Sequence, residues 1–90
     1  MRLAIAYDIS KDSNRRRVYN TLQRYGAWQQ YSVFELEISK TDRVELEDEL
    51  KAQIEPSDGD RIRIYRLCSS CMDATTDLGQ DPPDKQSNVL

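Results

Sequence analysis

The segment that most constrains the fold is the run LAIAY at residues 3–7, which is apolar at every position. Apolar residues at both parities are typical of a strand in the middle of a sheet, covered on both faces. Asp8 follows directly, so a strand over residues 2–8 would end in a carboxylate where the chain enters a loop. Functional residues are common at such junctions.

Three consecutive arginines, Arg15, Arg16 and Arg17, follow after a polar turn. A carboxylate held beside a basic helix start suits a metal ion, a phosphate or both. The alternative is that Asp8 caps a turn and the arginines cover a solvated helix face, which is the commonest role of a charge run.

The length of 90 residues allows one domain at most. A chain this small buries only about 60% of its unfolded surface, which favours dimerisation. We predict a single domain over residues 1–79 and a disordered tail over residues 80–90, where the chain is mostly polar and proline-containing. No apolar run approaches the roughly 18 residues of a membrane helix, and no signal-peptide pattern is present. We therefore expect a cytoplasmic protein with no membrane partner.

Charge is divided unevenly along the chain, although the net charge is only −3. Residues 1–30 carry six Arg or Lys against two Asp, and residues 31–60 carry three against ten acids. Binding to a polyanion depends on the local patch rather than on the total charge. The basic N-terminal third therefore keeps nucleic acid open as a partner.

The sequence contains no histidine, which excludes Ser-His-Asp and Cys-His catalysis and any His-ligated zinc. Its two cysteines, Cys68 and Cys71, form a single C-x-x-C that cannot complete a four-ligand zinc site within one chain. A redox or metal role is one interpretation of this pair. We predict instead that the pair is not essential and that Cys68 packs at the end of the last strand.

A helix is predicted after the first strand, with Asp12 or Ser13 as its N-cap and Gly26 as the C′ residue that ends it. Its buried stripe has spacings of four and three and consists of Val18, Leu22 and Tyr25. The arginines in its first turns oppose the helix dipole. Nothing nearby in the sequence offsets this cost, which favours an external anion.

Residues 27–38 are predicted to form two strands, because the apolar parity changes between Val33 and Phe34. Such a change exchanges the two faces and requires a bulge or a tight turn. A second helix is predicted over residues 41–54, with a capping box formed by Ser39 and Asp42. Its buried stripe consists of Leu46, Leu50 and Ile54, joined by Val44.

A last clear strand is predicted over residues 61–67, after a turn at 56–60. Ile62 and Ile64 lie on one of its faces, and the other carries Arg61, Arg63 and Tyr65. Residues 72–78 could form one more short strand.

The predicted order β-α-β-β-α-β is that of an α+β protein with the ferredoxin-like fold and an antiparallel sheet. Two helices would cover one face of the sheet, and the chain has no further element to cover the other. We therefore predict a homodimer that packs sheet to sheet. Function must be argued from the site, because this fold hosts many activities.

Five features of the sequence together resemble the small CRISPR-associated endoribonuclease family, the second core protein of CRISPR systems (Cas-two). They are YDIS at 7–10, Arg15, YG at 25–26, QYSVFE at 30–35 and RIYRLCSSC at 63–71. The match extends over about residues 1–71.

The resemblance implies a homodimer in which the two copies of Asp8 face each other and hold one divalent ion. From their charge alone, we predict that Arg15, Arg16 and Arg17 bind the phosphates of a nucleic acid. By position, the resemblance makes Tyr7, Asp8, Arg15, Arg17 and Phe34 the catalytic residues. It implies a metal-dependent endonuclease acting on single-stranded RNA or duplex DNA. It also implies a scaffold that bridges Cas-one integrase dimers during the acquisition of new spacers.

The chemistry of the residues agrees with part of this, because an oxygen ligand without His or Cys suits Mg²⁺ or Mn²⁺. The many acidic residues at 42–60 would repel DNA and so limit the part of the surface where it can bind. Arg61, Arg63 and Arg66 offer an alternative to the binding surface at Arg15, Arg16 and Arg17. Three function classes remain: a CRISPR adaptation subunit, a free-standing metal-dependent ribonuclease of the toxin type, and a non-enzymatic ferredoxin-like regulator. The combination of motifs favours the first.

Overall fold

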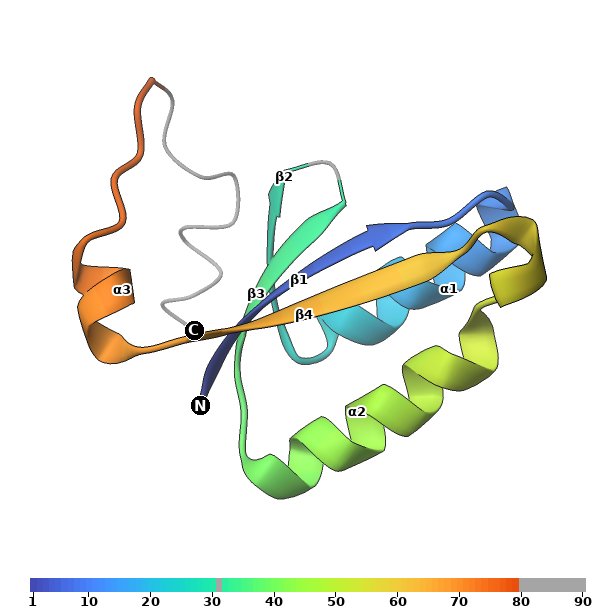
Figure 1. The fold of residues 1–90 in the computed structure, drawn as a ribbon, viewed down its shortest axis with the longest axis horizontal. Helices are drawn as coiled ribbons and strands as arrows, with labels where there is room; N and C mark the ends of the chain where they lie inside the picture. Colours follow the sequence, from blue (N-terminus) through green and yellow to red (C-terminus); the bar gives the residue numbers. More distant parts are fainter. Residues whose placement is uncertain (31, 80–90) are drawn as a thin grey trace.

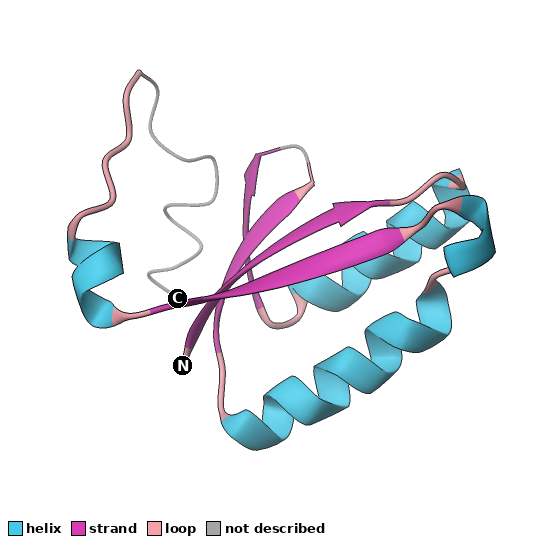
Figure 2. Ribbon diagram, in the orientation of Figure 1, coloured by secondary structure: helices cyan, strands magenta, loops and turns pink. Residues whose placement is uncertain are grey.

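The computed structural model of the chain describes residues 1–30 and 32–79. The tail predicted at 80–90 lies outside these residues. Within them, two long helices cover one face of a four-stranded antiparallel sheet (Figures 1 and 2). The elements are β1 (Arg2–Asp8), α1 (Asp12–Gln23), β2 (Gly26–Gln30), β3 (Val33–Glu37), α2 (Lys40–Gln53), the 3-10 turn η1 (Pro56–Asp58), β4 (Arg61–Leu67) and α3 (Ser69–Asp73).

The strands are arranged in the order β2-β3-β1-β4, so β1 pairs with a neighbour on each side. This position confirms the central strand predicted from LAIAY, and the arrangement confirms the ferredoxin-like fold. Along β1, the side chains of Leu3, Ile5 and Tyr7 are buried, whereas Ala4 and Ala6 are only partly buried and Asp8 is exposed. Successive side chains of a strand point to opposite faces, so Asp8 lies on the face away from the helices.

The core lies between the sheet and the two helices. Its fully buried side chains, each with 0% exposure, are Leu3, Ile5, Phe34 and Leu36 from the sheet, Val18 and Leu22 from α1, and Leu46 from α2. The predicted stripes of both helices are thus largely confirmed. Val44 is an exception, since 62% of its surface is exposed. Two positions along a helix turn the side chain by about 200°, which places Val44 opposite Leu46.

The start of α1 differs from the prediction. The N-cap is Lys11 and makes no side-chain capping hydrogen bond, so neither Asp12 nor Ser13 caps the helix. Asp12 is instead the first helical residue, and its carboxylate pairs with the guanidinium of Arg15 one turn later. The carboxylate therefore serves the first turn as a charge partner rather than as a cap.

Gly26 does not end α1 as predicted, because the C-cap is Arg24 in a right-handed helical conformation and Gly26 is the first residue of β2. The glycine is required for another reason. A Cβ atom built at Gly26 would collide with the backbone oxygen of Glu35 and with Leu36 on the neighbouring strand. The close approach of β2 to β3, rather than a left-handed turn, explains this residue.

The predicted cap of α2 is confirmed, because the Ser39 hydroxyl accepts a hydrogen bond from the Asp42 backbone N–H at 3.1 Å. At the other end of α2, the buried carboxylate of Asp60 accepts the backbone N–H groups of Ser10 and Glu55, each at 2.9 Å. These bonds join the loop that follows β1 to the loop that precedes β4. They hold the adjacent ends of the two strands together.

The parity change predicted near Val33 corresponds to the turn between β2 and β3, and the ladder shifts register between Trp28 and Gln30. The extra strand predicted at 72–78 is wrong. The chain forms the short helix α3 instead, because the Met72 N–H closes a helical turn onto the Cys68 carbonyl at 3.1 Å. Among the residues described, no helix is long and apolar enough to cross a membrane.

Candidate functional site

The first candidate site lies where β1 and β4 pair on the face away from the helices. In this ladder Asp8 is opposite Arg61 and Ala6 is opposite Arg63. Directly opposed residues of antiparallel strands share a face, with Cβ atoms about 5 Å apart. A cavity of 250 Å³, called here the Asp8 hollow, is lined by Ala6, Tyr7, Asp8, Arg61, Arg63 and Tyr65.

The Asp8 hollow combines one carboxylate with two guanidinium groups, so its net charge is positive. The Arg63 guanidinium stacks over the ring of Tyr65, with its central carbon 5.3 Å from the ring centre. The Tyr65 side chain is 47% exposed. Fixed guanidinium groups bind phosphate oxygens well, and the small side chain of Ala6 leaves room for a ligand. The hollow can therefore hold a phosphate group with a carboxylate beside it.

A second cavity, of 620 Å³, lies beside the start of α1 and is called here the α1 hollow. It is lined by Tyr7, Asp12, Arg15, Arg16, Tyr19, Trp28 and Ser32. Two of the three predicted phosphate-binding arginines therefore face a surface rich in aromatic side chains. Such a combination can contact both the backbone and the bases of a nucleic acid.

Local partners hold the guanidinium of Arg15. It donates to the backbone carbonyl of Ile9 at 3.1 Å and to the Asp12 carboxylate. This corrects the sequence-based expectation that nothing nearby offsets the unfavourable helix dipole. Arg15 is thereby oriented toward the loop that follows β1, and its charge is partly neutralised before any ligand binds.

The other arginines of residues 1–30 differ in the partners that their guanidinium groups have within the chain. Arg17 donates to the Asn14 side chain at 2.7 Å, and Arg24 pairs with Glu49 of α2 at 2.6 Å. Within residues 1–30 and 32–79, Arg16 makes no hydrogen bond or ion pair to another described residue. Arg16 is thus the arginine of this run whose guanidinium has no competing partner among the described residues, and Arg17 keeps its full charge because Asn14 is neutral.

The sheet divides the residues predicted to share one site. Tyr7 and Asp8 are consecutive, so their side chains point to opposite faces of β1. Asp8 lines the hollow on the open face, whereas Arg15 and Arg16 line the α1 hollow. Tyr7 is the residue that contributes to both cavities. Arg17 lines neither of them.

Comparison with known proteins identifies the family. The family model described as "CRISPR associated protein Cas2" matches residues 1–75 of the chain.

The chain belongs to the Cas2 family.

This result confirms the resemblance found in the sequence. "CRISPR-associated endoribonuclease Cas2 2" of Methanospirillum hungatei is 50% identical over 90 residues, which cover 100% of this chain and 99% of that protein. The crystal structure of Streptococcus pyogenes Cas2 at pH 6.5 is 26% identical, with a TM-score of 0.77 over 88% of this chain and 100% of that one. A chain of a partial Cas6-RT-Cas1–Cas2 complex is 28% identical, with a TM-score of 0.74 over 93% of this chain and 91% of that one.

Phe34 of this Cas2 chain has no exposed surface, so its side chain cannot touch a ligand directly. Its ring lies edge-on to Tyr19, with centroids 5.3 Å apart, and 6.4 Å from the ring of Tyr7. Phe34 stays a predicted catalytic residue, and its ring lies in the core of this structure. It can position the two tyrosines that line the α1 hollow.

Tyr7 has a pKa above its ordinary value, because burial disfavours the phenolate and the nearby Tyr19 adds to the effect. A hydrogen bond with the Ser32 side chain and the charge of Arg15 oppose the shift. Tyr7 is thus a neutral phenol at physiological pH. It can donate a hydrogen bond to a ligand but is not a general base.

Asp8 is the predicted metal ligand of this Cas2 chain, and it is the one carboxylate among the residues that line the Asp8 hollow. Within the part of the chain that the structure describes, no group of three or more His, Cys, Asp or Glu could hold a metal ion. The carboxylate oxygen of Asp8 is a suitable donor for Mg²⁺ or Mn²⁺, but Arg61 and Arg63 beside it disfavour a cation.

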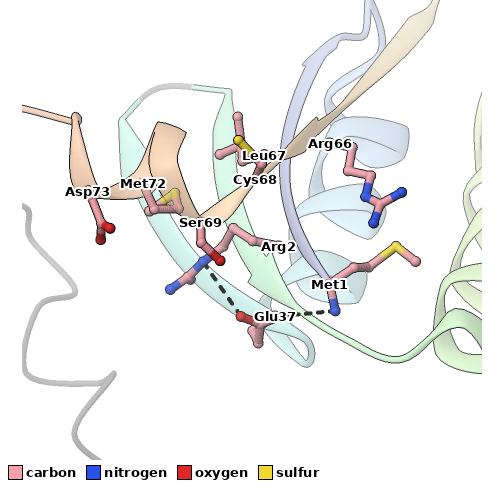
Figure 3. Close-up of a pocket in the computed structure, with 9 residues that line it drawn as sticks. All are labelled: Met1, Arg2, Glu37, Arg66, Leu67, Cys68, Ser69, Met72 and Asp73. Atoms are coloured by element: carbon pink, nitrogen blue, oxygen red, sulfur yellow. Dashed lines mark ion pairs between the residues drawn. The ribbon is translucent and has the colours of Figure 1, made fainter.

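A third cavity, of 460 Å³, lies at the opposite end of β4 (Figure 3). Three of its charged groups pair with one another, since Glu37 lies 3.0 Å from the Met1 ammonium group and 3.9 Å from Arg2. The hydrogen bond with the ammonium group lowers the pKa of Glu37. These pairs fix the first residue of β1 to the end of β3, so this part of the cavity has a structural role.

The grouping of Arg61, Arg63 and Tyr65 around Asp8 was missed by sequence reasoning. Strand periodicity correctly placed these three residues of β4 on one face. It did not reveal that β4 pairs with β1, nor that Asp8 lies opposite Arg61. Strand pairing depends on the packing of both helices and is absent from any local pattern.

Proposed function

We propose that this Cas2 chain acts in CRISPR adaptation as a homodimeric nucleic-acid-binding scaffold that works with a Cas1 integrase. The observation that carries the proposal is the position of Asp8 on the open sheet face beside Arg61 and Arg63. Membership of the Cas2 family supports the CRISPR role. The similar chain in the partial Cas6-RT-Cas1–Cas2 complex supports partnership with Cas1.

We further propose that the dimer forms through the open face of the sheet. Both long helices lie on the other face (Figure 1). The open face presents the half-exposed ring of Tyr65 opposite the small residue Ala4. Arg and Tyr side chains are enriched at the energetic centres of protein interfaces. Packing two such faces about a two-fold axis near the Asp8 hollow would bring the two Asp8 carboxylates together.

Nucleic acid would bind first through its phosphates. Arg16 and Arg17 at the exposed start of α1 and Arg61 at the start of β4 are the basic residues best placed for this. Contacts to phosphates fix position without reading sequence. We therefore expect binding that is insensitive to sequence and falls steeply with salt. Duplex DNA is the proposed ligand of the scaffold.

Cleavage of single-stranded RNA or of duplex DNA is the second part of the proposal. Nuclease activity is supported by relatives that are named endoribonucleases. The two Asp8 side chains would hold one Mg²⁺ or Mn²⁺ ion, because adjacent carboxylates cannot both ionise cheaply without a cation. The bound ion supplies an activated water. Arg61 and Arg63 orient the phosphodiester and stabilise the charge that develops on its oxygens.

The decisive experiment compares wild type with Asp8→Asn for cleavage and for DNA affinity, each with Mg²⁺ and with a chelator. Cleavage should fall by roughly 100-fold or more in the variant and in the chelator, because both remove the metal. DNA affinity should change little, since it depends on the arginines. Cleavage that survives the substitution would exclude Asp8 from catalysis, and loss of binding together with cleavage would give Asp8 a structural role.

The binding surface is tested by Arg16→Glu with Arg17→Glu, leaving Arg15 in place because it orders the loop. Lys51→Glu in exposed α2 is a matched control for charge reversal at a single site. The double variant should lose most DNA affinity and reduce the slope of log affinity against log salt by about 2, since about 0.9 is lost per phosphate contact. An unchanged slope would indicate that DNA binds at Arg61 and Arg63 instead.

The dimer is tested by light scattering at micromolar concentration. A mass near twice 10.5 kDa is expected for the wild type. Replacing Tyr65 with Glu on the open face should shift the population to the monomer, whereas Val44→Glu on the exposed side of α2 should not. A wild-type monomer at this concentration would contradict the proposal.

A further inference from the structure

The C-x-x-C pair is placed differently from the sequence-based expectation. Cys68 is the N-cap of α3 rather than a packed residue of β4, and Cys71 lies in α3 itself. Both side chains are exposed. Their sulfur atoms lie only 3.2 Å apart. The helical turn brings the two thiols together, and neither is shielded by the core.

The two sulfurs are already close to bonding geometry. A disulfide bond measures about 2.05 Å, so the sulfurs need to approach by roughly 1 Å more. Both side chains are exposed, so rotation about χ1 can change the distance between the two sulfurs. The four-residue segment from Cys68 to Cys71 therefore allows a disulfide within one chain.

The surroundings of Cys68 favour the reactive form of its thiol. Its pKa is lowered to about 7, first by a hydrogen bond with the Ser70 hydroxyl and then by the Cys71 thiol. The Ser70 oxygen lies 3.1 Å from the Cys68 sulfur. Arg66 and Asp73 line the same cavity as Cys68 (Figure 3). An exposed thiolate populated at neutral pH is the nucleophile in disulfide exchange.

We propose that Cys68 and Cys71 are a site of reversible oxidation, which forms an intramolecular disulfide by exchange with a low-molecular-weight disulfide. The Cys68 thiolate attacks one sulfur of the small disulfide, breaks its S–S bond and releases one thiolate. The Cys71 thiol loses its proton to solvent and attacks the Cys68 sulfur, which releases the second thiolate. The protein loses two electrons and two protons, and the small disulfide is reduced to two thiols.

A permanent zinc site is a weaker interpretation of the same pair. Tetrahedral zinc needs four ligands, and in residues 1–30 and 32–79 no third His, Cys, Asp or Glu joins the two cysteines in a possible metal site. Two sulfurs without further metal ligands are better explained as a dithiol that interconverts with a disulfide.

Oxidation would also fix the local backbone. The helix α3 has only five residues, and isolated helices of this length are unstable. Few hydrogen bonds hold its turn. Among them, the Met72 N–H donates to the Cys68 carbonyl, and the Thr75 hydroxyl donates to the Cys71 carbonyl at 2.9 Å. A bond between Cys68 and Cys71 spans this same turn. The disulfide would therefore keep α3 folded at the end of β4, whereas the reduced form would open more often.

The test is to incubate the reduced full-length protein with oxidised glutathione and to measure mass under non-reducing conditions. Wild type should lose two hydrogens, without a lasting glutathione adduct and without dimer formation by disulfides. Cys71→Ser should retain one glutathione on Cys68, because no second thiol displaces it. Cys68→Ser should react several-fold more slowly than Cys71→Ser. Amide hydrogen exchange in residues 69–75 should slow by severalfold on oxidation, while exchange in β1 should not change.

Two outcomes would overturn the proposal. The first is stable glutathione adducts on wild type or no change in its mass, since either shows that the two sulfurs do not bond to each other. The second is stoichiometric zinc in the purified wild-type protein that protects both thiols. A Cys68→Ser, Cys71→Ser double variant with the same melting temperature as the reduced wild type would confirm that the thiols themselves are not required for folding.

Discussion

The two faces of the sheet differ in burial and in charge. On the closed face, the helices cover Leu3, Ile5, Phe34 and Leu36, all without exposed surface. On the open face, β1 presents Ala4 and Asp8, and β4 presents Arg61, Arg63 and Tyr65, all partly or largely exposed. The strand β4 shows the contrast most clearly, because Ile62 and Ile64 are half-buried and Arg61, Arg63 and Tyr65 alternate with them in solvent.

This contrast separates partly buried apolar side chains from exposed polar ones along a single strand. Burying a large apolar side chain contributes about 1.5–3 kcal/mol to stability, whereas an exposed charged side chain contributes little. The closed face therefore supplies most of the folding free energy. The open face can carry arginines and a carboxylate at small cost to stability. Substitutions on β1, β3 and β4 should accordingly fall into two classes. Those on the closed face should lower stability, and those on the open face should change it little.

The largest expected difference is between Phe34→Ala and Tyr65→Ala. Removing the fully buried ring of Phe34 should lower the free energy of unfolding by about 3–5 kcal/mol, much of the stability of a small domain. Removing the half-exposed ring of Tyr65 should cost about 0.5 kcal/mol or less in the monomer. Urea titration in a dilute sample measures both values. Equal losses would show that the open face is covered by packing within the chain.

A smaller difference is expected between two glycines. Gly26→Ala places a methyl group against the Glu35 backbone oxygen and should cost about 1–3 kcal/mol through displacement of β2. Gly59→Ala meets no atom within 4 Å but must adopt a φ of +87°, which should cost about 1 kcal/mol. Thermal melts of the two variants compare steric conflict in the sheet with backbone strain in a turn. A larger loss at Gly59 would indicate that β2 can move away from β3 freely.

A pair of adjacent β4 variants sharpens the comparison within one strand. Ile64→Ala should lower stability by about 1–2 kcal/mol, less than Phe34→Ala because Ile64 is only half-buried. Arg63→Ala should leave stability within about 0.5 kcal/mol but weaken binding to DNA. Ile64→Ala should therefore show the larger loss in denaturation, and Arg63→Ala should show the larger loss of affinity in DNA titration. The same ranking in both assays would mean that β4 does not separate the two roles.

The smallest expected effect is the pH dependence contributed by Asp60. The backbone N–H groups of Ser10 and Glu55 lower the pKa of this carboxyl in the folded protein. A lowered folded-state pKa contributes stability above the unfolded pKa, and this is lost as the pH falls through the folded pKa. Wild type should therefore lose more stability than Asp60→Asn between about pH 5 and about pH 2. Parallel urea curves across this range measure the difference, and identical slopes would contradict it.

The sequence predicted the order of elements because each rests on a local period. The central position of β1 followed from LAIAY, the cap of α2 from Ser39 and Asp42, and the faces of β4 from strict alternation. The position of Asp8 at the exposed end of a strand was also predicted. These features depend on residues a few positions apart, which is the range over which sequence patterns are informative.

The errors arose where a residue type has more than one common role. Gly26 suits a helix end but here permits close strand pairing, and Asp12 suits a cap but here pairs with Arg15. The segment after Cys68 lacked a strong period, and local hydrogen bonds formed a helical turn. The partners of Asp8 could not be predicted, because the register of β1 with β4 is set by contacts between distant residues.

The pairing of Asp8 with Arg61 also has a consequence for how the protein is made. The two residues are neighbours across β1 and β4 but are contributed by the beginning and the end of the folded chain. During synthesis, β1 leaves the ribosome with nothing to occupy the side that β4 later takes. Only when residues 61–67 have emerged can the sheet acquire its last strand and the arginines reach the carboxylate. A truncated or stalled product would therefore expose an unpaired strand edge, which makes it prone to aggregation, and it would lack the Asp8 hollow.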